Sequence, residues 1–334
     1  MNIRVCAGFL FAISGLAAWA QNARLWLDFE GKRGPGTGKH VVLVSGDEEY
    51  RSEEALPQLA RILAERHGFR TTVLFAINHT DESIDPDRKD NIPGLEALDT
   101  ADLLILFTRF RDLPDEQMKH IVDYVESGRP VIGIRTATHA FDLKTHPTYA
   151  RWTWNSKDPE GGFGRQVLGE TWINHHGKHK VQSTRGILAK GQQQHPVLRG
   201  IRDGEIWGPT DVYEVRLPLP PDCTPLVFGQ VLTGMNSTDP PAATGNDPMM
   251  PVAWVKTYRG ANGKSSRVFT TTMGSSQDLL NEGFRRLLVN STYWAVGLEK
   301  HMPQRANVAL VGKYDPLPFG FGGFRKGVKV EDLR

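Results

Sequence analysis

Cysteine is nearly absent from this chain of 334 residues, which contains only Cys6 and Cys223. Cys6 lies in an amino-terminal segment that we expect to be removed, so the mature chain cannot form an intramolecular disulfide. A chain of this length can bury a core large enough to fold without such cross-links. Cys223 lies in a proline-rich, turn-like stretch with no histidine nearby, which argues against a catalytic nucleophile there.

The sequence has no excess of either charge and no motif for binding a nucleotide. Its 40 lysines and arginines nearly balance its 38 aspartates and glutamates. They form no basic stripe, so we expect no nucleic-acid partner. The first apolar run after residue 38 is followed by acidic residues rather than a glycine-rich phosphate loop, which argues against dinucleotide-binding and P-loop proteins. We therefore expect no cofactor, apart from a divalent metal considered below.

Only the first twenty residues contain a long hydrophobic run. A positive start (residues 1–4), an apolar run (residues 5–16) and the small residues Ala18 and Ala20 predict a signal peptide over residues 1–20. An uncleaved anchor is the alternative, but the run is shorter than the ~20 apolar residues of a membrane span. We expect an exported protein, periplasmic or extracellular, with no membrane span after cleavage and a leader over residues 21–37.

Residues 38–300 alternate between apolar runs and amphipathic stretches, as in an α/β domain. Uninterrupted apolar runs predict strands buried on both faces, at residues 40–45, 70–77, 103–107 and 131–134. Apolar residues at helical spacing predict helices between these strands, ending near Gly68, Leu98 and Gly128. This order predicts a doubly wound, mostly parallel sheet of the flavodoxin type in a single domain.

The pattern is less regular after residue 144. Tryptophans and glycines over residues 144–204 predict loops that cover a site. Strands are predicted again at residues 212–217, 225–232, 252–258 and 267–272, before a helix at about residues 281–296. Residues 301–334, which include Phe-Gly-Phe-Gly-Gly-Phe at 319–324, predict an extended tail lying on the domain.

Polar side chains follow three of the predicted parallel strands, where ligands bind in open α/β sheets. They are Glu48, Glu49 and Arg51 after the first strand, Arg109 after the third, and Arg135, Thr138 and His139 after the fourth. The two glutamates and His139 are candidate catalytic acid–base groups, and the others are candidate substrate ligands. Structural roles are the alternative, since glutamates favour helix starts and arginines form salt bridges.

Several stretches together make the chain resemble the trehalose-utilisation (ThuA-like) family over about residues 38–298. They are Val41-Val42-Leu43-Val44, Pro130-Val131-Ile132-Gly133, His195-Pro196-Val197, Pro251-Val252-Ala253-Trp254, Arg267-Val268-Phe269 and Tyr293-Trp294-Ala295-Val296-Gly297. The resemblance implies a fold like that of class I glutamine amidotransferases and a link to disaccharides or their keto derivatives. Amidotransferases place a cysteine in the turn that begins here with Arg135, so glutaminase activity is not implied. Ser275 stands where many relatives are expected to have histidine.

The covering segment contains a cluster of histidines. His175 and His179 are four residues apart, the spacing of two zinc ligands on a helix, but Gly177 opposes a helix and no glutamate lies between them. We expect His175, His176 and Asp211 to bind substrate hydroxyls, and keep His175 and His179 as candidate ligands of a metal such as zinc. Four aromatic residues are candidates for stacking on sugar rings or for the core: Trp152, Trp154, Trp172 and Tyr213.

Two functions are consistent with these features. The first is an exported enzyme, a hydrolase or lyase acting on a disaccharide, a glycoside or a keto derivative. The second is a non-catalytic sugar-binding or assembly protein on the same fold, which the missing nucleophile favours. A deep pocket with perturbed carboxylates would favour the enzyme. For both functions we expect a small carbohydrate as the partner. A homo-oligomer is compatible with either function.

Overall fold

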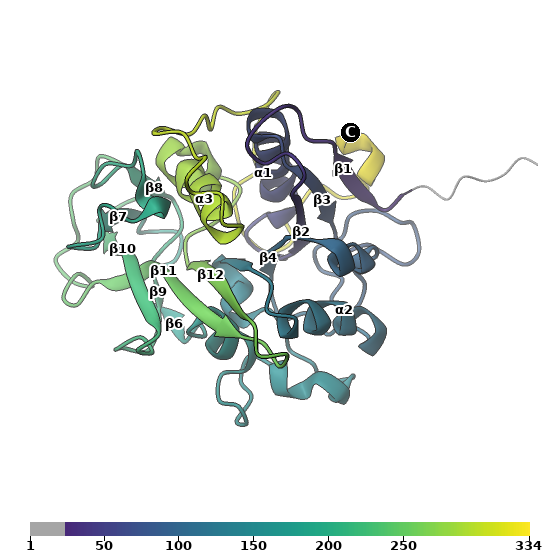
Figure 1. The fold of residues 1–334 in the computed structure, drawn as a ribbon. Coiled ribbons are helices and arrows are strands. Elements are labelled where there is room, and N and C mark those ends of the chain that lie inside the picture. The colour runs from purple at the N-terminus through teal and green to yellow at the C-terminus, as the bar shows by residue number, and fades with distance from the viewer. Residues whose placement is uncertain (1–23) are drawn as a thin grey trace, which may run out of the picture.

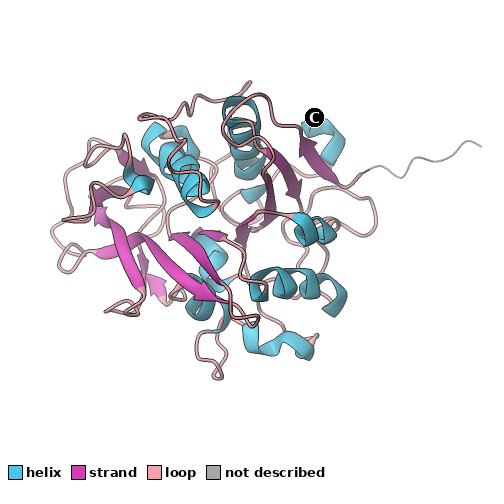
Figure 2. Cartoon of the chain, viewed as in Figure 1, coloured by secondary structure: helices cyan, strands magenta, loops and turns pink. Residues whose placement is uncertain are grey.

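The computed structural model describes residues 24–334, which form one large mixed sheet with helices on both faces (Figures 1 and 2). In spatial order its strands are β1 (Trp26–Phe29), β3 (Arg70–Leu74), β2 (His40–Gly46), β4 (Leu103–Thr108), β5 (Val131–Ile134), β12 (Ser265–Thr271), β11 (Met250–Arg259), β10 (Cys223–Val231), β7 (Thr184–Leu188) and β8 (Ile206–Gly208). The predicted signal peptide, residues 1–20, lies outside the described residues. Between residues 24 and 334, none of the helices is long and apolar enough to cross a membrane.

Five neighbouring strands, β3, β2, β4, β5 and β12, run parallel to one another. In β2, Val41 and Leu43 pack into the core on one face of the sheet, and Val42 and Val44 pack into the core on the other. A strand covered on both faces has no solvent side, which is why its sequence shows no alternation. The predicted doubly wound α/β fold in a single domain is confirmed.

Helices cover both faces of this parallel block. α1 (Ser52–His67) and α3 (Glu282–Ala295) pack on one face, and α2 (Asp115–Glu126) packs on the other together with the 3₁₀ helix η1 (Leu95–Thr100), as Figure 1 shows. α1 ends where predicted, because Gly68 adopts a φ of 81° and its N–H donates to the carbonyl of Ala64 in the last turn of the helix. The three long helices thus lie on the faces of the sheet, and they do not cover the edge at which the parallel strands have their carboxyl ends.

Beyond β12 the sheet continues in antiparallel strands that the sequence predicts only in part. β10, β11 and β12 correspond to predicted strands, whereas β1, β7 and β8 are not predicted. The sequence of β7 is Thr-Arg-Gly-Ile-Leu, in which polar residues and a glycine interrupt the apolar run. The strand predicted at residues 212–217 is wrong in extent, since only β9 (Tyr213–Glu214) is extended there. It pairs with β6 (Asn174–His175) in a small second sheet.

The three polar turns that follow β2, β4 and β5 converge, because these strands are adjacent and parallel. Each turn contains one non-glycine residue with a left-handed backbone: Arg51 (φ 59°), Phe110 (φ 48°) and Arg135 (φ 49°). This conformation is unfavourable for such residues, and it persists where the surroundings fix it, often at functional sites. The turns therefore hold particular side chains in fixed positions.

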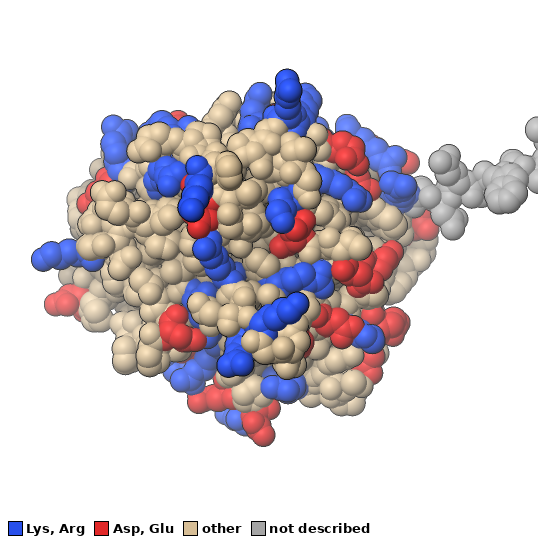
Figure 3. All heavy atoms as spheres, in the orientation of Figure 1, with Lys and Arg blue, Asp and Glu red and all other residues tan. Residues whose placement is uncertain are grey.

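The surface carries both charges in close proximity. Basic and acidic side chains are interspersed over the face shown in Figure 3. Several form pairs, such as Lys32 with Glu65 and Lys39 with Asp102, each at 2.9 Å. Such exposed pairs contribute little stability individually, but mixing the two signs leaves this face without a broad field of one sign.

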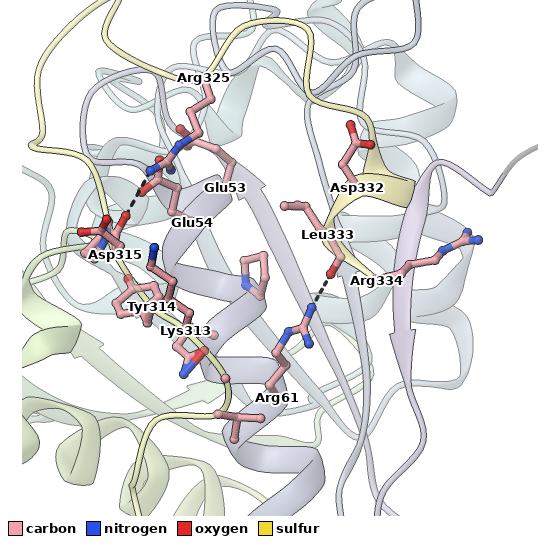
Figure 4. Close-up of a pocket in the computed structure, with 15 residues that line it drawn as sticks. Glu53, Glu54, Arg61, Lys313, Tyr314, Asp315, Arg325, Asp332, Leu333 and Arg334 are labelled. Carbon is pink, nitrogen blue, oxygen red and sulfur yellow. Dashed lines mark hydrogen bonds and ion pairs between the residues drawn. The ribbon is translucent and has the colours of Figure 1, made fainter.

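The carboxyl-terminal segment, residues 301–334, lies along α1 and ends beside β1 (Figure 1). Figure 4 shows Arg325 reaching Glu54 and the carbonyl of Asp315, and Arg61 reaching the carbonyl of Leu333. A groove of about 480 Å³ runs between α1 and this segment. The groove does not contain the predicted site residues, and two of these contacts, Arg325 with Glu54 and Arg61 with Leu333, join α1 to the segment across it.

Glu53, in the first turn of α1, is a buried carboxyl group without a partner. It is 8% exposed, and among residues 24–334 neither of its oxygens has a hydrogen-bond partner. Burial raises the pKa of Glu53 to about 8. A carboxyl group whose pKa is higher in the folded than in the unfolded state takes up a proton on folding. The free energy of unfolding therefore falls as the pH rises from the pKa of this group in the unfolded state to its pKa in the folded state.

We predict that Glu53→Gln removes this pH dependence. Between about pH 5 and about pH 8 the free energy of unfolding of the wild type should fall, relative to the variant, by roughly 1.4 kcal/mol per pH unit. Urea unfolding across this range measures both proteins. Glu65→Gln on the same helix is the control, because a hydrogen bond from Lys32 lowers the pKa of Glu65. Parallel pH curves for wild type and Glu53→Gln would contradict the assignment.

Candidate active site

The carboxylate of Asp211, just before β9, lies at the centre of a hydrogen-bonded cluster. It accepts hydrogen bonds from Arg135 Nη2 at 2.9 Å, His175 Nδ1 at 2.6 Å and His179 Nδ1 at 3.0 Å. Burial on its own would raise the pKa of Asp211. The charge of Arg135 and the hydrogen bonds from the two histidines outweigh burial and lower that pKa well below its usual range. Asp211 is therefore an anion that holds three side chains.

Arg135 lies behind Asp211, away from solvent. It also donates to the main-chain carbonyls of Asp211 and Thr272, each at 2.7 Å, and to the hydroxyl of Tyr50 at 3.1 Å. Its guanidinium carbon is 3.5 Å from the centroid of the Tyr213 ring. With its side chain fully buried, Arg135 is placed to position Asp211 rather than to touch a substrate.

His179 lies between two carboxylates. Its Nδ1 contacts Asp211 and its Nε2 contacts Glu49 at 3.1 Å. An ionised carboxylate only accepts hydrogen bonds, so both ring nitrogens of His179 must carry protons. The hydrogen bonds to Asp211 and Glu49 accordingly raise the pKa of His179 to about 9. His179 is a cation at neutral pH, and its side chain is 27% exposed.

His175 also contacts Asp211. Unlike His179, it has no partner for its second ring nitrogen, Nε2, among residues 24–334. Its Nδ1 contacts Asp211 at 2.6 Å, so in the neutral form of the ring the lone pair is on Nε2, and the side chain is 32% exposed. The ring centroids of the two histidines are 4.8 Å apart. A tight turn brings them together, not a helix, as Gly177 predicts. His176 differs, since its Nε2 contacts the carbonyl of Gly245 at 2.9 Å.

Glu48 is held between two arginines. Its carboxylate contacts Arg109 Nη1 at 2.5 Å and Arg111 Nη2 at 2.6 Å, with Lys89 Nζ at 3.8 Å. The side chain of Arg111 is buried, whereas that of Arg109 is 19% exposed. Arg51 is buried beneath the same turn and donates to the carbonyl of Glu48 at 3.3 Å. Of these cationic groups, Arg109 and Lys89 have side chains with solvent access, and that of Lys89 is 48% exposed.

Asp47 shapes the turn that presents the two glutamates. It accepts hydrogen bonds from the main-chain N–H groups of Glu49 and Tyr50, at 2.7 and 2.5 Å, and from the hydroxyl of Thr136. Burial raises the pKa of Asp47 to about 6, and the negative charge of Glu48 adds to the effect. These contacts give Asp47 a structural role in the turn.

His139 is brought to the same edge of the sheet but is buried. Its ring lies 4.8 Å from the Phe110 ring and 5.0 Å from the Trp172 ring, between centroids. Burial, and the nearby positive charges of Arg109 and other cationic groups, lower the pKa of His139 well below the usual value. It is thus neutral near pH 7. Thr138 is also buried, and its hydroxyl lies 3.2 Å from His139 Nδ1.

A row of half-buried aromatic rings borders the histidine pair. Ring centroids are 5.4 Å apart between Phe110 and Trp154, 6.4 Å between Trp154 and Trp172, and 6.0 Å between Trp172 and His175. We call Phe110, Trp154 and Trp172 the aromatic wall. Phe110 is not among the candidates from sequence, because nothing local distinguishes it from other residues after a strand. The two remaining aromatic candidates are buried: Trp152 and Tyr213.

The same cluster has the spacing of a metal site. The ligand atoms of His175, His179 and Asp211 all lie within 4.8 Å of one another. Two imidazoles and a carboxylate suit zinc. A metal bound through His179 Nδ1 would have to displace the proton that this atom donates to Asp211. These residues can therefore hold either a proton network or a divalent cation.

Comparison with known proteins gives one family. A family model described as ThuA, trehalose utilisation, matches residues 40–295. Similar solved structures include ThuA-like proteins from Parabacteroides merdae (15% identity, 77% of this chain and 90% of that chain, TM-score 0.48) and Bacteroides uniformis (15%, 79% and 93%, TM-score 0.49). A β-galactosidase from Rahnella sp. R3 shares 11% identity over 78% of this chain and 32% of its own, with a TM-score of 0.40. No curated protein matches the chain.

We predict that Asp211→Asn destabilises the fold by about 3 kcal/mol, because it leaves the buried charge of Arg135 without its carboxylate. Denaturant unfolding measures the loss. Asp222→Asn is the matched control: Asp222 pairs with Lys256, but its side chain is 48% exposed, so the cost should stay within about 0.5 kcal/mol. Equal losses in the two variants would show that Asp211 does not balance a buried charge.

Proposed function

Because this chain belongs to the ThuA trehalose-utilisation family, whose role is in carbohydrate metabolism, we propose that it is an enzyme that cleaves a glycosidic bond. Its substrate would be a disaccharide, a glycoside or a keto derivative of one, and the reaction a hydrolysis or an elimination. The observation that carries the proposal is the pair formed by His175 and His179 on one buried carboxylate. One ring is a proton donor and the other has a free nitrogen, 4.8 Å away between centroids.

The two histidines supply the two proton transfers that such a cleavage needs. His179, as an imidazolium, donates its Nε2 proton to the oxygen of the departing sugar, which takes the place of Glu49 as the acceptor of this N–H. His175 Nε2 accepts a proton, either from an attacking water in a hydrolysis or from a carbon next to a keto group in an elimination. Asp211 keeps both rings oriented and stabilises the positive charge that His175 gains. Glu49 holds the second nitrogen of His179.

The surrounding side chains suit a neutral, hydroxylated substrate. Arg109, whose side chain is 19% exposed, offers N–H donors to hydroxyl or keto oxygens, and Glu48 fixes its orientation at 2.5 Å. The aromatic wall offers flat apolar faces beside the histidines. In this proposal Glu48 and Glu49 act through Arg109 and His179, and the neutral His139 supports the wall.

The decisive test is turnover of purified protein on a panel of disaccharides, glycosides and 3-keto glycosides. His175→Gln and His179→Gln should each lower kcat/KM by about 10²- to 10⁴-fold, the usual contribution of acid–base groups. His176→Gln is the matched control and should keep wild-type activity, because His176 bonds to Gly245 instead. Binding of a sugar without turnover would favour the sugar-binding alternative. Activity that needs zinc and is lost with chelator would assign the cluster to a metal.

The proposal also predicts how kcat/KM depends on pH on the alkaline side. An acid with a pKa of about 9 is protonated at neutral pH and loses its proton as the pH rises through that value. We therefore expect kcat/KM to fall above about pH 9. Glu49→Gln removes one of the two carboxylates that raise this pKa, so it should move the limb to lower pH. A limb that stays in place in Glu49→Gln would remove His179 from the role of proton donor.

A further inference from the structure

The carboxyl-terminal segment is fastened to the body close to the candidate site. The hydroxyl of Tyr314 donates to the carbonyl of Ser276 at 2.6 Å, and the N–H of Leu317 donates to Glu54 at 2.8 Å. Arg325, at the other end of this stretch, also pairs with Glu54 (Figure 4). The stretch between Leu317 and Arg325 is therefore tied at both ends to α1 and its surroundings.

Within this stretch, Gly320 is bound directly to the turn that carries the two glutamates. Its N–H donates to the carbonyl of Glu49 at 2.7 Å, and its own carbonyl accepts from the buried guanidinium of Arg51. A Cβ at Gly323 would lie 2.7 Å from Arg51 Nη2, so a side chain there would disturb this guanidinium. Arg51, a predicted substrate ligand, instead joins the segment to the site.

The two phenylalanines on either side of Gly320 have opposite environments. Phe319 is 6% exposed, and its ring centroid lies 5.4 Å from that of Tyr50 and 5.6 Å from that of His179. Phe321 is 62% exposed. Phe319 thus anchors the segment beside the proton donor, while Phe321 presents most of its ring to solvent.

Phe321 lies on Arg109, whose side chain is 19% exposed. The guanidinium carbon of Arg109 is 5.0 Å from the centroid of the Phe321 ring and 4.6 Å from that of Phe110. Phe110 belongs to the aromatic wall, so Arg109 links that wall to the carboxyl-terminal segment. The exposed ring therefore borders the same solvent-facing region as Arg109.

We propose that Phe321 is a substrate-binding residue: its exposed ring forms the outer wall of the site and stacks on the sugar unit distal to the cleaved bond. This inference rests on the proposed function and adds a subsite to it. The segment lies outside residues 40–295, the part that matches the family model. The subsite is thus a feature of this chain's own carboxyl-terminal segment, and it selects substrates with a second ring over single-ring glycosides.

The test compares variants at two phenylalanines of the same motif. Phe321→Ala should raise KM for the preferred disaccharide or keto-disaccharide by about 3- to 10-fold, the range of one aromatic contact. It should leave kcat unchanged, because stacking acts on bound substrate and transition state alike. KM for a methyl glycoside, which has no second ring, should not change. Phe321→Trp should restore KM. Phe324→Ala is the control, since Phe324 faces Lys326.

Three outcomes decide between the two proposals. A rise in KM confined to Phe321→Ala and to two-ring substrates supports the subsite. A wild-type KM in Phe321→Ala, with activity still lost in His175→Gln, overturns the subsite and leaves the proposed function standing. No turnover or binding of any sugar by the wild type overturns both. The melting temperature of Phe321→Ala should equal that of the wild type, because this side chain is exposed and buries little apolar surface.

Discussion

The buried carboxylate of Asp211 is the interaction on which the arrangement of the site depends. It joins Arg135, at the end of the parallel strand β5, to His175 and His179 in the covering segment. A buried charge needs its full set of partners, because removing one leaves another charge without solvent or counter-ion. In the absence of a metal, these bonds keep Nδ1 of both histidines directed at Asp211.

This constraint explains why only a few of the many charged groups in the site are accessible to a substrate. Glu48, Arg111, Arg51 and Arg135 are buried and are held by ion pairs or by hydrogen bonds to the main chain, so they act as supports. The groups with solvent access are the two histidines, Arg109, Lys89 and the aromatic wall. Supports of this kind hold reacting groups in place before substrate arrives, which is what proton transfer requires. Left-handed turns at Arg51, Phe110 and Arg135 serve the same purpose.

The sequence predicts the frame of this site better than its details. Strands buried on both faces appear as apolar runs, so β2, β4 and β5 and the convergence of their polar ends can be predicted, and the family match confirms the resemblance. Which side chains face solvent cannot be predicted. Arg109 and Arg135 occupy equivalent places after strands, yet the side chain of Arg109 is 19% exposed and that of Arg135 is fully buried. The contact of Phe321 with Arg109 joins residues far apart in sequence, and no local pattern encodes it.

The protonation of His179 tests this account most directly. Imidazole ¹⁵N NMR of histidine-labelled protein, assigned with His175→Gln and His179→Gln, reports whether each ring nitrogen carries a proton. The account predicts that both nitrogens of His179 stay protonated up to a pKa of about 9, while His175 Nε2 is unprotonated at high pH. Loss of a proton from His179 at the ordinary histidine pKa of about 6.5 would contradict it, because the two carboxylates would then not hold an imidazolium between them.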